Sequence, residues 1–339
     1  MGNRFGLDIG SNSVKAVQIA KNGQTISLVA AGMIKSPPNV FSSDSEKDLV
    51  TLAEAIKKLV SEANIRANEA VVAIPERHVF TQVFEFPEMK EDDLNQAIPW
   101  EAENLIPKPL SEVNLDWEVI DDEDSRKAGK VRVLLIASPK ELVNKYTKVL
   151  KLANLVPAAL ETELLAILRC LRPMVKDKSL AIANLGAGSC DIAIIKRGYF
   201  YNTRSLPTAG EAITRGLSSS LGLDLQVAEE YKKTYGLTAQ VEGKVSAEIE
   251  PLLTVVANED KKAISFYEGK EKDRLGLLVL TGGTCLLPGI SEFFTRQLGI
   301  EVQVADPFSL VSLDGQIPLE LKKSSPLYTV ALGLAMKEG

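Results

Sequence analysis

The order of apolar and polar positions divides the chain into two halves that begin alike. Each half opens with three short runs typical of β-strands, at residues 4–34 and 179–205, and glycines interrupt both sets. Helical periodicity follows each set, at 44–62 in the first half and between 207 and 274 in the second. The repeated order predicts an internal duplication, with two α/β lobes and a cleft between them.

A β-α-β-β-α pattern between about residues 79 and 157 predicts an inserted subdomain with a sheet of its own. A charged loop is expected inside it at 121–129, and a helix directly after it at 161–172. We therefore expect four units, which are a first lobe core (1–78, 159–178 and 325–339), the inserted subdomain (79–158), a second lobe core (179–206 and 275–324) and a helical subdomain (207–274).

Composition excludes several classes of protein. The 339 residues carry a net charge of −6 without a dense basic stripe, which argues against a nucleic-acid partner. No apolar stretch approaches the roughly 20 residues that span a bilayer. Cys170, Cys190 and Cys285 are scattered, as expected of reduced thiols in the cytosol. Because His78 is the only histidine, sites built from several histidines are excluded.

The first chemically distinctive loop connects two predicted strands at residues 7–15. Asp8 ends a buried strand, and Gly10 lets the backbone turn and expose its N–H groups as an anion site. Asp8 would approach Mg²⁺ through water, and Lys15 could reach phosphate oxygens. The alternative is a simple hairpin held by an Asp8–Lys15 ion pair.

Two further glycine loops follow in the second half. Residues 183–191 repeat the strand–turn–strand frame, with Gly186 and Gly188 where phosphates need a close backbone approach. A strand rather than a helix follows this turn, so it does not match the dinucleotide fingerprint. Residues 279–289 place two consecutive glycines after a buried strand. The alternative for this third loop is a strand-to-helix turn that needs left-handed residues.

These three loops, in this order, resemble the motifs of the actin-like ATPase superfamily, which includes actin, Hsp70 chaperones, sugar kinases and the division protein FtsA. The resemblance implies a two-lobed, duplicated ribonuclease H-like fold that binds ATP or ADP with Mg²⁺ in the cleft. The residues it assigns to the phosphates are Gly10, Ser11, Asn12, Ser13, Lys15, Gly186, Ala187, Gly188 and Ser189. Those it assigns to adenosine are Glu229, Lys232, Gly282, Gly283 and Thr284, and Asp8 is the metal-side carboxylate.

One departure from the superfamily pattern bears on hydrolysis. Asn184 stands where members that hydrolyse ATP usually carry Asp, and an amide cannot accept a proton from water. Glu163 occupies the place of a water-orienting residue and is the remaining candidate catalytic group. We therefore expect nucleotide binding with slow ATPase activity at most.

The inserted subdomain narrows the resemblance. Residues 96–107 form a helix ending in Ile-Pro, and an Asn-Leu-Asp-Trp strand follows at 114–117. Both closely resemble the PilM family of type IV pilus assembly proteins. That resemblance implies a cytoplasmic platform that holds the N-terminal cytoplasmic peptide of PilN in a groove between the first lobe and the inserted subdomain. The groove candidates are Ile98, Trp100, Leu105 and Trp117; the alternative for this helix is core packing.

Further partners and rival functions follow from the same resemblance. Other platform and motor proteins are candidate partners, and weak self-association is a further candidate. The chain stops after its closing helix without the amphipathic tail of FtsA-like proteins, so we expect it at the inner membrane only through its partner. The rivals are an FtsA-like filament-forming division adaptor and a small-molecule kinase of the actin fold.

We also expect ATP to fix the angle between the lobes and so to alter partner affinity.

Overall fold

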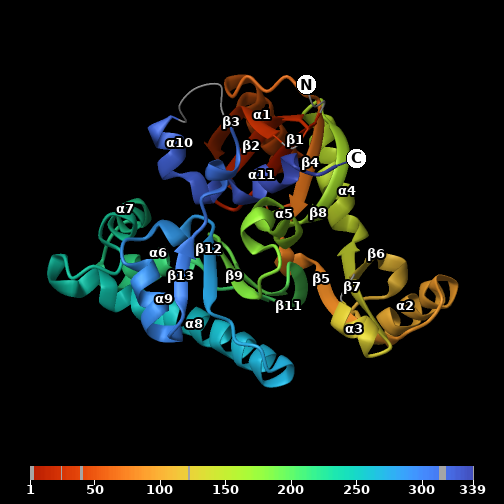
Figure 1. Ribbon diagram of the computed structural model, residues 1–339. Helices are drawn as coiled ribbons and strands as arrows, with labels where there is room; N and C mark the ends of the chain where they lie inside the picture. Colours follow the sequence, from red (N-terminus) through yellow and green to blue (C-terminus); the bar gives the residue numbers. More distant parts are fainter. Residues whose placement is uncertain (1–3, 24, 39–40, 121–122, 313–317, 339) are drawn as a thin grey trace.

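The computed structural model describes residues 4–23, 25–38, 41–120, 123–312 and 318–338. Two five-stranded sheets share one topology, with strand orders β3-β2-β1-β4-β8 and β11-β10-β9-β12-β13. The sheets form the cores of two lobes (Figure 1). The first comprises β1 (Arg4–Ile9), β2 (Ser13–Asn22), β3 (Thr25–Lys35), β4 (Glu69–Ile74) and β8 (Val156–Thr162). The second comprises β9 (Leu180–Leu185), β10 (Cys190–Lys196), β11 (Tyr199–Leu206), β12 (Leu277–Thr281) and β13 (Glu301–Val304).

The register of the strands repeats as well as their order. β1 runs antiparallel to β2 and parallel to β4, and β9 has the same relation to β10 and β12. Asp8 lies opposite Lys15 in the first lobe, and Asn184 lies opposite Asp191 in the second. The duplication expected from the sequence is therefore confirmed down to the equivalent pairs of polar residues.

Two helices lie between the lobes and hold them together. α5 (Glu163–Val175) packs with residues of β4, β9 and β10 in one apolar cluster, and α11 (Thr329–Ala335) crosses it closely. A Cβ atom placed on Gly333 of α11 would lie only 1.9 Å from the Ala166 carbonyl oxygen of α5. Only glycine permits this approach, because any side chain would push the two helices apart.

The remaining long helices cover the outer faces of the two sheets. α1 (Glu46–Glu62) and α4 (Lys140–Leu152) share an apolar cluster with the first sheet. The sequence assigned residues 140–152 to the inserted subdomain, but Tyr146, Val149 and Leu150 bury their side chains against the first lobe. The second lobe carries α6 (Gly210–Leu221), α7 (Leu225–Tyr235), α8 (Lys244–Glu271) and α9 (Ile290–Leu298), and a short α10 (Leu319–Lys323) precedes α11.

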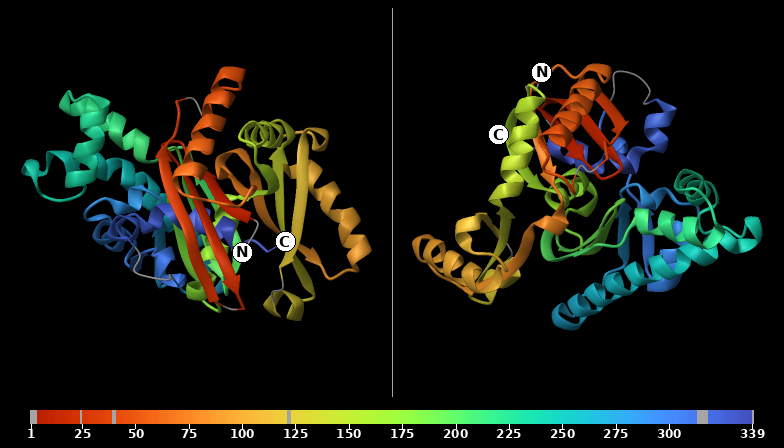
Figure 2. Two further views of the ribbon diagram at one scale, coloured as in Figure 1. Left: turned by 90° about the horizontal axis from the view of Figure 1, so that it is seen from above. Right: turned by 180° about the vertical axis from the view of Figure 1, so that it is seen from behind.

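The inserted subdomain has its own sheet of three strands in the order β5-β7-β6. Its elements are β5 (Phe80–Pro87), α2 (Glu91–Leu105), β6 (Val113–Ile120), α3 (Glu123–Lys127) and β7 (Lys130–Pro139). α2 covers the outer face of this sheet, away from both lobes (Figure 2). α3 replaces most of the expected charged loop, and residues 121 and 122 of that loop lie outside the described residues.

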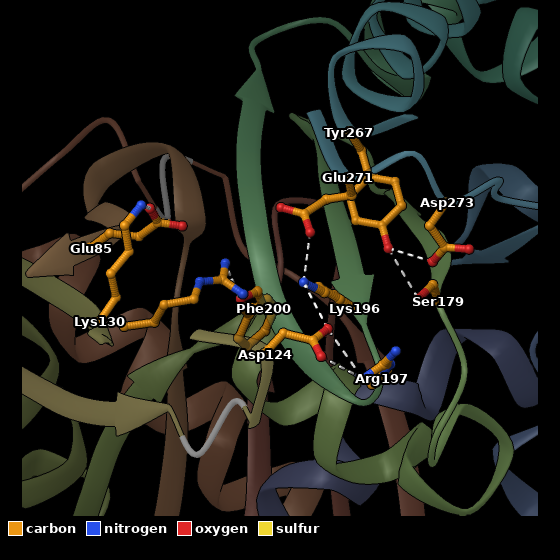
Figure 3. Close-up of polar contacts among 11 residues, drawn as sticks. Glu85, Asp124, Lys130, Ser179, Lys196, Arg197, Phe200, Tyr267, Glu271 and Asp273 are labelled. Atoms are coloured by element: carbon orange, nitrogen blue, oxygen red, sulfur yellow. Dashed lines mark hydrogen bonds and ion pairs between the residues drawn. The ribbon is translucent and has the colours of Figure 1, made fainter. Parts of the chain in front are cut away.

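The inner face of the inserted sheet rests on the second lobe. Asp124 of α3 forms ion pairs with Lys196 at 3.4 Å and with Arg197 at 3.1 Å (Figure 3). The buried Arg132 guanidinium of β7 lies 4.9 Å from the ring centroid of Tyr201 on β11. The inserted subdomain therefore contacts both lobes rather than projecting from the first one alone.

One prediction about local structure was wrong, and two strands were not predicted. The helix expected from residue 161 begins only at Glu163, because residues 161 and 162 end the strand β8, which was not expected. The Thr162 hydroxyl caps α5 by accepting the Leu165 N–H at 3.3 Å. The short strand β13 was not expected. The three cysteines are free and buried, and none of the described helices is both long enough and apolar enough to span a membrane.

Candidate functional site

Two glycine turns with the same geometry lie at equivalent ends of the two sheets. In the β1–β2 turn, the Gly10 N–H donates to the Ser13 carbonyl at 3.1 Å. In the β9–β10 turn, the Gly186 N–H donates to the Ser189 carbonyl at 3.0 Å. A Cβ atom on either glycine would lie 2.9 Å from the carbonyl that it contacts. Both turns therefore depend on glycine to bend this tightly.

The two turns approach each other across the lobes. A Cβ atom on Gly188 of the second turn would lie 2.7 Å from the Ser11 hydroxyl of the first. The same Cβ would lie 2.6 Å from Nη1 of Arg77, a residue that the sequence analysis did not single out. The two predicted phosphate turns are thus brought together so closely that a side chain at Gly188 would clash with Ser11 and Arg77.

The first turn carries a buried ion pair. Lys15 Nζ lies 2.9 Å from Asp8 Oδ2, and the two residues are 8% and 4% exposed. This ion pair is the one expected if residues 7–15 form a simple hairpin, and it neutralises the charge of Lys15 in this conformation. Among the described residues, no group of three His, Cys, Asp or Glu side chains could hold a metal ion. Mg²⁺ would fit here through Asp8, water and the phosphates of a nucleotide, which is its usual manner of binding.

The second turn carries a fully buried carboxyl instead of an ion pair. Asp191 accepts hydrogen bonds from the hydroxyls of Ser205 at 2.6 Å and Ser189 at 3.4 Å, and from Asn184 Nδ2 at 3.5 Å. Burial raises the pKa of Asp191 to about 6. The Asn184 amide therefore donates a hydrogen bond to Asp191. It does not supply the proton-accepting carboxylate that members of the superfamily that hydrolyse ATP usually carry at this position.

Two glutamates complete an acidic cluster between the lobes. Burial, and after it the carboxylates of Asp191 and Asp8, raises the pKa of Glu163 well above its ordinary value. Glu76, in the 3₁₀ turn that follows β4, accepts a hydrogen bond from the Thr81 hydroxyl at 2.7 Å, and burial raises its pKa to about 7. The surroundings of Glu163 therefore favour its uncharged form over its carboxylate form.

The predicted adenosine residues lie beside the second turn. The Thr284 hydroxyl donates to the Gly186 carbonyl at 2.9 Å. Lys232 Nζ donates to the Gly210 carbonyl at 3.0 Å and pairs with Glu229 at 2.6 Å, and burial lowers the pKa of Lys232. The structure therefore brings these residues together with the second phosphate turn, although they are far apart along the chain.

The adjacent glycine pair at 282 and 283 is also required by close packing. Gly282 has a φ of +86°, and a Cβ atom there would lie 2.6 Å from the Leu185 carbonyl oxygen. A Cβ atom on Gly283 would lie 3.1 Å from the Leu327 side chain. The strand-to-helix turn needs a left-handed residue at Gly282, as the alternative for this loop supposed, and it presses against the end of β9.

The four groove candidates on the inserted subdomain have different environments. Trp100 and Leu105 on α2 are 68% and 38% exposed, whereas Trp117 on β6 is half-buried against the core of the subdomain. Ile98 is only 1% exposed and belongs to that core. The choice of Ile98 as a peptide contact was therefore wrong, because a side chain sealed beneath α2 cannot line an open groove.

Comparisons with known proteins extend over nearly the whole chain. The family model described as "Type IV pilus assembly protein PilM" matches residues 6–339. The solved structure of a PilM–PilN type IV pilus biogenesis complex has a TM-score of 0.87 and 28% identity, covering 99% of this chain and 98% of that one. Cell division protein FtsA of Neisseria meningitidis serogroup B is 24% identical over 97% of this chain and 88% of its own length. MreB5 of Spiroplasma citri bound to AMPPNP has a TM-score of 0.54 at 15% identity, covering 97% of this chain and 94% of that one, which confirms the actin-like fold.

Proposed function

The chain belongs to the family of the type IV pilus assembly protein PilM, and on that premise we propose that it is the ATP-binding platform of a pilus assembly complex at the inner membrane. The likeness to the PilM–PilN complex carries this proposal, because it extends over 99% of this chain and so includes the inserted subdomain. Partner binding by that subdomain would distinguish this protein from other actin-like proteins.

The proposed partner is the N-terminal cytoplasmic peptide of a PilN protein, captured in a groove between the first lobe and the inserted subdomain. Trp100 is 68% exposed on α2, which covers the outer face of the inserted sheet, so it offers an apolar docking surface on the subdomain outside this groove. Binding to a membrane-anchored partner would keep the chain at the cytoplasmic face of the inner membrane.

The proposed ligand of the two turns is ATP or ADP with Mg²⁺. The matched turns at Gly10 and Gly186 would offer backbone N–H groups to the phosphates, and Lys232 and Thr284 border the adenosine side. MreB5, which shares the fold, binds AMPPNP. Hydrolysis would be slow, because Asn184 stands where superfamily members that hydrolyse ATP usually carry Asp, and an amide cannot accept a proton from water.

The test is a calorimetric titration with a synthetic peptide of the N-terminus of PilN from the same organism, with and without ATP–Mg²⁺. We expect saturable one-to-one binding that Trp100→Ala leaves unchanged if the peptide lies in the groove; a loss of about tenfold or more would instead place the peptide on the outer face of α2, because interface tryptophans are frequent hot spots. Phe266→Ala is the matched control, since Phe266 is 58% exposed on α8 of the other lobe. The absence of peptide binding in every nucleotide state would refute the platform proposal.

The similarity to FtsA over 97% of the chain favours one second candidate, a filament-forming division adaptor. Sedimentation of the purified protein at rising concentration with ATP separates the two. A filament protein sediments above a critical concentration, whereas a peptide-binding platform stays in the supernatant at every concentration.

A further inference from the structure

Arg77 lies on the segment through which the chain leaves the first lobe for the inserted subdomain. This segment is the 3₁₀ turn Glu76–His78, between the end of β4 and the start of β5. Nη1 of Arg77 lies within 2.6 Å of the place where a Cβ atom on Gly188 would stand, and Ser11 Oγ lies 2.7 Å from the same point. The guanidinium is thus located where the two phosphate turns meet.

The charge of Arg77 differs from that of Lys15 in an important respect. Lys15 is paired with Asp8 at 2.9 Å, whereas no carboxylate of the described residues forms an ion pair with Arg77. Arg77 Nε donates to His78 Nε2 at 3.0 Å, and the guanidinium lies 5.0 Å from the ring centroid of Phe41. These contacts orient a planar cation without neutralising it. A guanidinium in this state is well suited to bind a phosphate with two hydrogen bonds.

A second polar side chain reaches the same region from the other connection of the inserted subdomain. The chain returns from β7 into α4, which carries Tyr146. This residue is 4% exposed, and among the described residues its hydroxyl has no hydrogen-bond partner. Burial, and after it the carboxylates of Glu163 and Asp8, raises the pKa of Tyr146, whereas Arg77 lowers it. Tyr146 belongs to the same apolar cluster as Ile9 and Val14, which stand on either side of the first turn, and a buried hydroxyl normally has a partner.

We propose that Arg77 and Tyr146 bind the phosphate chain of the nucleotide, so that both connections of the inserted subdomain take part in the nucleotide site. This inference rests on the proposed nucleotide site and adds to it two residues that the phosphate motifs do not contain. Because each residue lies on a segment that joins the inserted subdomain to the first lobe, phosphate binding draws both segments toward the turns. The inserted subdomain then senses the nucleotide through these segments, in addition to any change in the angle between the lobes.

The test compares the affinities of ATP and adenosine, each with Mg²⁺, for wild-type protein, Arg77→Gln and Arg77→Lys. We expect Arg77→Gln to weaken ATP binding about ten- to hundredfold, as is typical for the loss of charge-assisted hydrogen bonds, and to leave adenosine binding unchanged. Arg77→Lys should fall between wild type and Arg77→Gln, because it keeps the charge and loses the planar fork. Arg172→Gln, on the exposed end of α5, is the matched control and should bind both ligands like wild type.

The outcomes separate this inference from the proposed function. Wild-type protein that binds no ATP would overturn both, since no phosphate would then occupy the turns. Wild-type binding of ATP that Arg77→Gln leaves unchanged would overturn the present inference alone. An equal loss of ATP and adenosine affinity would also overturn it, because a purely structural defect does not distinguish ligands by their phosphates. In the same variant, the effect of ATP on affinity for the PilN peptide should shrink.

Discussion

Removing a single oxygen atom from Tyr146 should have opposite effects on the protein with and without nucleotide. The Tyr146→Phe substitution keeps the ring that packs with α1 and the first sheet. Its hydroxyl has no partner among the described residues, and an unpaired buried polar group costs about 1–3 kcal/mol. Without nucleotide we therefore expect the variant to be more stable than wild type, by up to about that amount.

With ATP–Mg²⁺ the sign should reverse. If the Tyr146 hydroxyl donates to a phosphate, its loss removes a hydrogen bond to a charged group, worth about 1.5–3 kcal/mol. ATP binding should then weaken about tenfold or more, and the stabilisation that ATP gives to the variant should shrink accordingly. Urea unfolding followed by circular dichroism, at zero and at saturating ATP, measures both effects in one series.

Tyr267→Phe is the matched control, because Tyr267 is buried but its hydroxyl is paired. Its hydroxyl lies 2.7 Å from Asp273 and 3.1 Å from Ser179, which precedes β9 at the end of the strand opposite the second turn (Figure 3). Its loss should destabilise the protein by about 1 kcal/mol and leave ATP affinity unchanged. The reasoning is refuted if Tyr146→Phe is destabilised like Tyr267→Phe without nucleotide, or if its ATP affinity equals that of wild type.

Two further predictions concern stability. Gly333→Ala should lower the unfolding free energy by at least about 1 kcal/mol, since the new Cβ would lie 1.9 Å from the Ala166 carbonyl oxygen and overpacking outweighs the better helix propensity. Gly269→Ala on α8, where no atom lies within 4 Å of the new Cβ, should instead raise the unfolding free energy by about 0.5–1 kcal/mol. The midpoints of urea unfolding measure both changes. A loss of stability at Gly269 as large as at Gly333 would contradict the packing argument. The pKa of Glu76 is raised from 4.5 to about 7, so its contribution to stability is complete below pH 4.5 and is lost as the pH rises through 7, by roughly 3 kcal/mol at most. Urea midpoints between pH 5 and 8 should therefore fall in wild type and change less in Glu76→Gln; parallel curves would show that Glu76 is not the titrating group.

Local signals were sufficient to predict the two glycine turns. Gly10 and Gly186 each stand between two runs of strand-forming residues, and a tight turn between paired strands is formed by residues next to one another in the chain. The helix α1 was likewise predictable, because Ser45 caps a clear apolar periodicity that ends at Glu62. Each of these features depends on the conformation of one short segment.

Elements whose conformation depends on distant neighbours were missed. β8 contains Pro157 and two alanines, residues that are poor in strands, and it is stable as the edge strand beside β4. β13 has only four residues and gains its conformation from pairing with β12. The periodicity of α4 showed that one face would be buried, but not that the first lobe would bury it.

The sequence by itself determined the duplicated halves, the glycine turns and the presence of Asn184 in the second of them, because backbone preference and periodicity are properties of contiguous residues. Only the tertiary structure decided which charges meet. It paired Lys15 with Asp8, placed Arg77 against Gly188 of the other lobe and brought Tyr146 into the apolar cluster beside the first turn. A single arginine in a turn belongs to no periodic pattern, so the sequence does not show which residues will surround it. Its neighbours come from distant segments and are set only when the two lobes pack together.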